Sequence, residues 1–277
     1  YGAQAGIPTI ILEHGYMDNF PSIVDRGQLI VVGPSSVLLG DAYENAEGLL
    51  LNPSEEDFES VIVSNAIWQV FATSVNQKRA KVCFRGEAPT LKTFATAWYG
   101  KASSPLRGVK TFDIGDGTIV HVDSFSGDYG GAVGQKMLAE NAKIAGGGSL
   151  CVDGNANLWM YGKNNTCTGT LSVASTSSRE IVMYDGANWA GTVEGYNVEL
   201  KSSAAGNCCT NAFGGLNLGA NANFTLNVKA DGGCDRLNLG AMGFTGSGTL
   251  TIKLASEVPT SRCTIASVLK TANALPK

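Results

Sequence analysis

The sequence predicts an all-β fold, a right-handed parallel β-helix or solenoid, and three observations support this. Glycine supplies 35 of the 277 residues, whereas only 16% of the residues are charged. Val, Ile, Thr, Leu, Ser and Asn dominate the remainder, a mixture typical of short strands closed by turns. Apolar strand starts recur about every 21–23 residues between positions 150 and 254, and stacking of such units buries one continuous core.

The spacing of the strand starts is read from near-copies of one segment. LNLGA occurs at 216–220 and again at 237–241. Moving LNLGANANFTLN at 216–227 back by 66 positions places it on LCVDGNANLWMY at 150–161, with the NAN triplet and the apolar alternation preserved. Because 66 is three times 22, two further units are expected in between.

Two segments fill that interval, GTLSV at 169–173 and GTVEGYNVEL at 191–200. The predicted strand starts are therefore 150, 171, 193, 216 and 237, and GTLTIKL at 248–254 follows with the same Gly-Thr lead. Apolar and polar residues alternate with a period of two inside each unit, which indicates half-buried strands. Ten side chains are expected to stack in the core: Leu150, Val152, Leu171, Val173, Leu216, Leu218, Leu237, Leu239, Leu250 and Ile252. Leu216 and Leu218 are expected to lie on Leu237 and Leu239 of the next coil.

The N-terminal half is less regular than the C-terminal half. We therefore divide the chain into an irregular β-rich section, 1–133, and a section of regular coils, 134–277, which can form one continuous domain. Gly134–Lys143 is the one helix candidate. A β-sandwich is the alternative fold, since it also needs many short strands separated by turns. The strand-like runs of the first section are Gln28–Val32, Val37–Leu39, Gly48–Leu51, Ser60–Val63, Ile67–Phe71, Ala80–Phe84 and Thr118–Val122.

The repeated asparagines Asn155, Asn157, Asn221 and Asn223 fall at predicted turns. Asparagine tolerates left-handed backbone geometry there, and its amide can stack on the equivalent amide of a neighbouring coil. The indole of Trp159 is interpreted either as packing between coils or as a platform for carbohydrate.

The C-terminal segments resemble a known class of surface protein. GGLNLGANANFTLNV, GSGTLTIKL and ASEVPTSRCTIASVL are similar to passenger regions of autotransporters and related bacterial surface β-helices, in which Gly-Thr-Leu strand starts recur. The resemblance covers about residues 150–270. It implies a secreted or surface-displayed β-helix, and it brings no catalytic motif from which a residue role could be transferred.

Charge and hydropathy exclude some partners and indicate a location. The net charge of −4 without a basic cluster argues against nucleic acid as the partner. No apolar run approaches the roughly 18–20 residues that a membrane-spanning helix needs. The sequence begins with Tyr1 rather than Met, so we expect a processed N-terminus, from a cleaved signal peptide or a longer precursor, and an extracellular or cell-surface location.

Seven cysteines are present, and none are spaced as CxxC, which argues against zinc-ribbon and thioredoxin sites. Five of them lie between 167 and 263, which suits disulfides formed in an oxidising compartment. Buried thiols are the alternative, and the connectivity stays open. The disulfide candidates are Cys151, Cys167, Cys208, Cys209, Cys234 and Cys263.

The richest polar stretch is TFDIGDGTIVHVDSFSGDYGG at 111–131. If the chain is an enzyme, we expect its site to contain Asp113, Asp116, His121 and Asp123, since paired carboxylates can act as acid and base. His121 and Asp123 would share one face of a strand, with Val120 and Val122 turned into the core. The alternative interpretation makes the aspartates turn residues and His121 an exposed strand residue. No metal or cofactor motif is present, so we expect no cofactor.

These observations favour a non-enzymatic secreted or cell-surface protein, structural or adhesin-like, that serves as a fibre or surface-assembly subunit. Its expected partners are other protein chains, with glycans as a second class. Two alternatives stay open: a β-helix enzyme that degrades polysaccharide, and a phage or viral tail-fibre module.

Overall fold

The computed structural model describes 14 segments of the chain, and every structural statement below concerns these residues. All regular structure in them is β-strand, and no helix occurs in the described part. The segments are 6–17, 23–34, 36–39, 51–70, 80–93, 109–124, 132–134, 143–152, 157–173, 180–202, 208–228, 233–247, 249–254 and 269–270.

The strands form three long sheets, A, B and D, and one short sheet, C. Sheet A contains, in spatial order, β1 (Thr9–Glu13), β4 (Gln28–Val32), β7 (Phe58–Ser64), β9 (Ala80–Arg85), β11 (Val109–Ile114) and β14 (Lys143–Gly146). Sheet D contains β13 (Ala132–Gly134), β16 (Asn157–Met160), β18 (Glu180–Tyr184), β20 (Asn197–Lys201), β22 (Asn223–Val228) and β24 (Thr249–Leu254). Sheet C pairs β3 (Ile23–Asp25) with β6 (Leu51–Pro53).

Sheet B is the longest, with 11 strands, and it runs through both sections of the chain that the sequence distinguishes. Sheet A ends at β14 and sheet D begins at β13, so the change from A to D falls near the predicted boundary at residue 134. The strands of sheet B, in spatial order, are β2 (Tyr16–Met17), β5 (Val37–Leu39), β8 (Ile67–Val70), β10 (Thr90–Thr93), β12 (Ile119–Ser124), β15 (Ser149–Val152), β17 (Leu171–Val173), β19 (Asn188–Glu194), β21 (Thr210–Leu218), β23 (Arg236–Gly246) and β25 (Leu269–Lys270).

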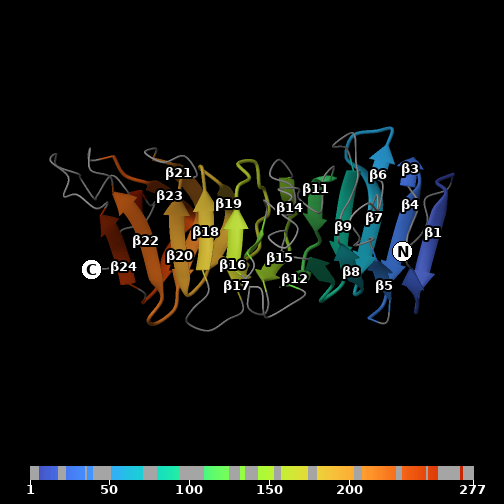
Figure 1. Cartoon of the computed structure of the whole chain (residues 1–277), viewed down its shortest axis with the longest axis horizontal. Helices are drawn as coiled ribbons and strands as arrows, with labels where there is room; N and C mark the ends of the chain where they lie inside the picture. The colour runs from blue at the N-terminus through green and yellow to red at the C-terminus, as the bar shows by residue number, and fades with distance from the viewer. Residues whose placement is uncertain are drawn as a thin grey trace.

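Every pair of named strands is parallel. Parallel neighbours need a crossover between them, and here the crossovers are strands of the other sheets. Figure 1 shows the strands side by side along the long axis, from β1 at one end to β24 at the other. The hairpin-built β-sandwich is therefore wrong for the described strands, since hairpins would pair them antiparallel.

The register of sheet B confirms three of the four predicted steps. Leu150 is the Cα partner of Leu171, Leu171 of Val193, and Val193 of Leu216, which are steps of 21, 22 and 23 residues. The fourth step is wrong, because Leu216 pairs with Phe244 rather than with Leu237.

The fourth step fails because the two LNLGA copies occupy opposite ends of their strands. The first copy ends the 9-residue strand β21, whereas the second lies near the start of the 11-residue strand β23. An irregularity between Phe213 and Gly215 adds residues between the two halves of the pairing, so Leu237 lies beside Asn211 and Leu239 beside Phe213. The copies lie on neighbouring strands, but they are not stacked on each other.

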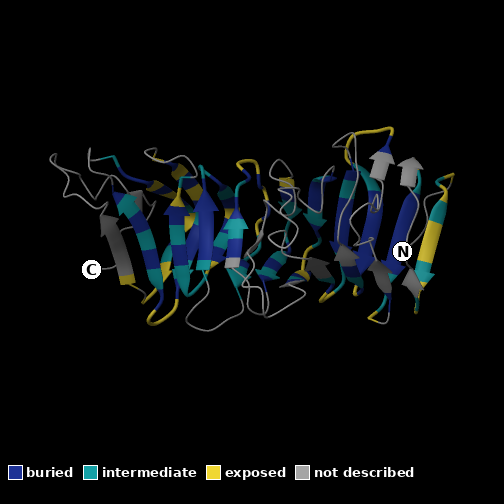
Figure 2. Cartoon of the chain, in the orientation of Figure 1, coloured by how far each residue is buried: buried dark blue, intermediate teal, exposed yellow. Residues whose placement is uncertain are grey.

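The space between the sheets is filled by one apolar cluster that extends from Leu29 to Leu239 (Figure 2). Trp68 and Trp189 are completely buried in it. Of the ten core side chains predicted, Leu150, Val152, Leu171, Leu216, Leu218, Leu237 and Leu239 are buried, and Val173 packs against the cluster. Leu250 and Ile252 lie in β24, and their side chains lie outside the described part.

The N-terminal strand predictions agree with the structure to within a few residues. Gln28–Val32 and Val37–Leu39 are β4 and β5. The predicted runs beginning at Ser60, Ile67, Ala80 and Thr118 overlap β7, β8, β9 and β12, whereas Gly48–Leu51 meets β6 at Leu51 alone. The helix candidate is wrong at both ends, since Gly134 ends β13 and Lys143 begins β14; residues 135–142 lie outside the described part.

A column of glycines crosses sheet B at the start of its strands, where neighbouring backbones nearly touch. A Cβ atom on Gly169 would lie 2.0 Å from the carbonyl oxygen of Gly148, and one on Gly191 would lie 1.9 Å from that of Gly169. Gly148 and Gly214 meet the carbonyl oxygens of Gly115 and Ala190 in the same way, at 2.3 and 2.0 Å. No side chain fits at such distances, so the Gly of the Gly-Thr leads is required by backbone contact.

Buried amides form a second column beside the glycines. The backbone N–H of Ile144 donates to Asn165 Oδ1 at 2.9 Å, and that of Asn165 donates to Asn188 Oδ1 at 2.9 Å. Asn188 Nδ2 returns a bond to the Asn165 carbonyl at 2.7 Å. The prediction of stacked asparagines thus applies to residues 165 and 188, which the sequence did not single out for it.

The asparagines named for stacking have more varied environments. Asn223 Nδ2 donates to Asn197 Oδ1 at 3.4 Å across β22 and β20. Asn221 has a φ of 67°, the left-handed geometry expected at a turn. Asn155 and the side chain of Asn157 lie outside the described part.

We expect Gly191→Ala to lower the free energy of unfolding by about 2–4 kcal/mol, because the new methyl group must displace the Gly169 carbonyl. Gly219→Ala is the matched control, since a Cβ there meets nothing within 4 Å, and a change within about 0.5 kcal/mol is expected. Urea unfolding followed by circular dichroism measures both variants. Equal stability of the two would contradict the close contact.

Candidate functional site

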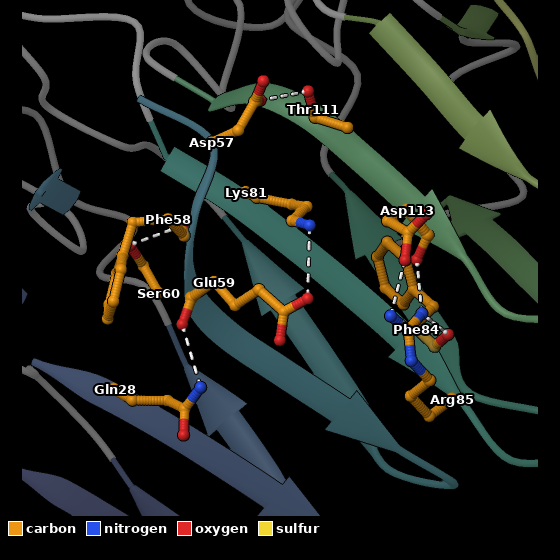
Figure 3. Close-up of polar contacts among 10 residues, drawn as sticks. All are labelled: Gln28, Asp57, Phe58, Glu59, Ser60, Lys81, Phe84, Arg85, Thr111 and Asp113. Carbon is orange, nitrogen blue, oxygen red and sulfur yellow. Dashed lines mark hydrogen bonds and ion pairs between the residues drawn. The ribbon is translucent and has the colours of Figure 1, made fainter. Parts of the chain in front are cut away.

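The outer face of sheet A carries the largest group of interacting charged side chains that the structure describes. Along β7, β9 and β11, Val61, Val82 and Phe112 are buried in the core. The intervening residues lie on the other face of the sheet. Glu59, Lys81 and Thr111 are Cα partners in one row. Figure 3 shows this face, with acidic and basic side chains alternating across neighbouring strands.

Arg85 is held by Asp113 of the next strand. Its Nη2 lies 2.5 Å from Asp113 Oδ2, and its Nη1 donates to the carbonyl oxygens of Asp113 and Phe84 at 3.0 and 2.8 Å. About a quarter of each charged side chain is exposed. Burial lowers the pKa of Arg85, but the Cys83 and Asp113 groups more than offset this, so the pKa is raised. The guanidinium therefore acts as a charged clamp between β9 and β11.

A second ion pair joins β7 to β9. Lys81 Nζ lies 3.2 Å from Glu59 Oε1, and Gln28 Nε2 of β4 donates to the Glu59 carbonyl at 3.1 Å. Burial acts to lower the pKa of Lys81, yet the hydrogen bond to Glu59 and nearby acidic groups raise it overall. Lys81 therefore stays protonated at neutral pH and is not a general base.

A third group lies at the start of β11. Lys110 Nζ approaches Glu56 at 2.7 Å and Asp57 at 3.7 Å. Thr111 Oγ1 donates to Asp57 Oδ1 at 2.6 Å. Asp57 has a φ of 56°, and it places its carboxylate here from the turn before β7. Each of these contacts links residues 54 positions apart in sequence.

Cys83 lies among these charges, yet it belongs to a small apolar cluster. Ile30, Ile62 and Cys83 are Cα partners on β4, β7 and β9, and all three are buried on the side of sheet A away from the main core. Burial, with the charge of Glu59, raises the pKa of the Cys83 thiol to about 12. The thiol is therefore protonated at neutral pH and is a packing group rather than a nucleophile.

The four residues predicted for a catalytic site are divided over the molecule. Asp113 lies in β11 of sheet A, whereas His121 and Asp123 lie in β12 of sheet B. Asp116 lies in the turn between them, with its Oδ1 in the space beside Gly147. Only Asp113 belongs to the charged group, and there it is occupied by Arg85. The structure does not place these four residues on one common face.

The local prediction around His121 agrees with the structure. Val120 and Val122 are buried, while Ile119 is 43% exposed and His121 is half-buried, so the strand alternates as expected. The side chain of Asp123 lies outside the described part.

Sequence inspection missed Glu59, Lys81 and Arg85 as partners of one group. Their contacts join residues 22 to 28 positions apart, which no short motif records. The available indication was that FESVIVS, AKVCFR and VKTFDI carry charges at equivalent alternate positions, and it becomes useful only once the strands are known to be neighbours.

Aromatic side chains link strands on the outer face of sheet D. Tyr161 and Tyr184 stack in parallel with ring centroids 4.5 Å apart, and the Trp159 ring meets Tyr184 edge-on at 5.9 Å. Lys201 of β20 lies 5.9 Å from the Tyr184 ring centroid, which adds a cation–π contact. For Trp159 these contacts favour packing between strands over a carbohydrate platform.

The disulfide prediction is wrong for the described cysteines. No disulfide links Cys83, Cys151, Cys167, Cys208, Cys209 or Cys234, and Cys263 lies outside the described part. The Cys167 thiol donates to the Gly148 carbonyl at 3.1 Å, and the Cys209 thiol lies 3.3 Å from Asp235 Oδ1. Burial raises their pKa values to about 11 and about 12. These cysteines are grouped in sequence, but each buried thiol has its own oxygen partner at a different level of the sheets.

Two further comparisons bear on function. Among the described residues there is no group of three or more His, Cys, Asp and Glu side chains that could hold a metal ion, and no helix able to cross a membrane. Neither a protein-family model, nor a curated protein, nor a solved structure matches the chain. Function is therefore inferred from the contacts and the strand register of the chain itself.

Arg85→Met is expected to destabilise the fold by about 1–3 kcal/mol, because it leaves the partly buried Asp113 carboxylate and two carbonyl groups without their donor. Lys110→Met is the matched control, since its ion pairs are exposed and are expected to contribute little. Chemical unfolding of both variants tests this. A larger loss for Lys110→Met would show that the clamp assigned to Arg85 is misplaced.

Cys83 predicts a loss of stability at alkaline pH. An unfolded cysteine ionises near pH 8.5, whereas the folded thiol keeps its proton to about pH 12, so the folded state binds the extra proton between these values. Stability should then fall as pH rises, by up to about 1.4 kcal/mol per pH unit. Cys83→Val should remove this part of the slope between pH 9 and 10.5 in urea unfolding. A constant difference between the two proteins from pH 7 to 10.5 would contradict the prediction.

Proposed function

We propose that the chain is a non-enzymatic structural module of a secreted or cell-surface protein, built as a right-handed parallel β-helix. The parallel pairing and the passage of the chain from sheet to sheet support this architecture. Sheet B is the spine of the proposed helix, because its 11 strands extend from β2 to β25. Each coil adds a strand to this spine and apolar side chains to the core.

The observation that carries the proposal is that charged and amide side chains bind neighbouring strands rather than converge on one point. Arg85 binds Asp113, Lys81 binds Glu59, and Asn165 binds Asn188, each across adjacent levels of the stack. Asn227 Nδ2 likewise donates to the Leu200 carbonyl at 2.6 Å. In an enzyme, unpaired acids and bases would face a substrate. Here the pairs hold the levels together, as a rod or spacer requires.

The end of sheet A supports assembly with other protein chains. β1 is the outermost strand of this sheet in the described part, and it pairs with β4 alone. Its Ile10 and Ile11 are 47% and 48% exposed (Figure 2, at the N-terminal end). An edge strand with exposed apolar side chains recruits a further strand. We infer that the partner is another β-rich chain, in a fibre or a surface assembly, and that glycans are a second class of partner in an adhesin-like role.

Ile10→Lys is expected to reduce self-association, because a charge on an edge strand opposes the addition of another strand. Ile119→Lys is the matched control: Ile119 is similarly exposed, but its strand β12 is paired on both sides. Light scattering over a range of concentrations, with electron microscopy, measures the size and shape of each protein. A concentration-independent monomer for the unmodified chain would overturn the assembly, and a compact globule in place of a rod would overturn the architecture.

A further inference from the structure

The outer face of sheet B brings together an imidazole and a thiol that are 30 residues apart in sequence. His121 of β12 and Cys151 of β15 are Cα partners. Their chain neighbours Val120, Val122, Leu150 and Val152 are buried in the core, so the two side chains lie on the opposite, outer face. Both are half-buried, so they remain accessible to a small molecule.

The register fixes how close these groups lie. Adjacent parallel strands are about 4.8 Å apart, so equivalent side chains on one face are direct neighbours. This spacing brings an imidazole nitrogen within reach of a proton on the Cys151 sulfur. The row continues with Thr90 on the far side of His121 and Ser172 on the far side of Cys151.

Cys151 differs from the thiols that the core contains. Cys83, Cys167 and Cys209 are buried, and burial raises the pKa of each, which keeps them protonated and unreactive. Cys151 is half-buried and has an imidazole beside it, the combination that activates thiols elsewhere.

We propose that Cys151 is a nucleophilic thiol, activated by His121, that undergoes exchange with low-molecular-weight disulfides. The site is separate from the proposed structural function and does not depend on it. It would give the rod one covalent attachment point in the middle of sheet B.

The exchange step is balanced within the pair and its co-reactant. The Cys151 proton passes to the His121 imidazole, and the thiolate attacks one sulfur of the disulfide. A bond forms between Cys151 Sγ and that sulfur, while the original S–S bond breaks. The leaving thiolate takes the proton from the imidazolium, so a mixed disulfide and a free thiol are the products.

Other ionisable groups around the pair lie farther along the row or along the strands. Glu194 is two strands beyond Cys151 at the same level, through Ser172. Asp123 and Lys92 are Cα partners two residues beyond His121 and Thr90. His121 is the titratable group at the level of Cys151 on the adjacent strand, so it is the base that the experiment must test.

The test treats the full chain with oxidised glutathione and follows each cysteine by peptide mass spectrometry between pH 6 and 9. We expect Cys151 to be modified first, and at pH 7 faster than in the urea-unfolded chain. His121→Gln should slow Cys151 at pH 7 by at least about tenfold and move its pH profile towards that of an ordinary thiol. Ser172→Ala, which alters the other neighbour of Cys151 and keeps the imidazole, should leave the rate unchanged.

Two results would overturn the proposal. One is a native Cys151 that reacts no faster than the same residue in the unfolded chain. The other is an unchanged rate and pH profile in His121→Gln, with the fold verified by circular dichroism. If His121→Gln does not fold, the comparison of native and unfolded wild-type protein at pH 7 decides alone.

Discussion

The rest of the structure depends on the close backbone contact at the glycine column of sheet B. At Gly169 and Gly191 the carbonyl oxygen of the preceding level occupies the position that a Cβ would take. A slip of one residue would bring a side chain, such as that of Thr170 or Thr192, to this contact. The contact therefore fixes the register and keeps Leu171 and Val193 on the core side.

A fixed register determines which side chains become neighbours. Residues at equivalent positions of successive strands lie about 4.8 Å apart, so identical charges would repel and opposite charges attract. Sheet A meets this requirement by setting Lys81 beside Glu59, and Arg85 clamps Asp113 in the same way. Inside, the buried amides of Asn165 and Asn188 satisfy backbone groups of the neighbouring level. Polar groups in this molecule are stabilised by the next level, so each level supports its neighbours.

The sequence predicted those features that repeat locally and missed those that depend on strand length. The period-two alternation and the Gly-Thr leads placed Leu150, Leu171, Val193 and Leu216 in register. The second LNLGA was misplaced, since identical letters do not reveal the irregularity beside Phe213 or the length of β23. The charged partners were missed for the same reason: a separation of 22 or 28 residues becomes a contact only after the register is known.

The outer faces of the sheets are less constrained than the core and the glycine column. A side chain on an outer row contacts chiefly its own sheet and the strands on either side, so its exchange disturbs few other groups. One row can therefore pair acid with base, as on sheet A, while another sets His121 beside Cys151 on sheet B. The backbone contact that holds the stack together also brings distant residues side by side. For this reason chemistry can be added to an outer row without a pocket, and a rod whose main role is structural can still carry a reactive pair.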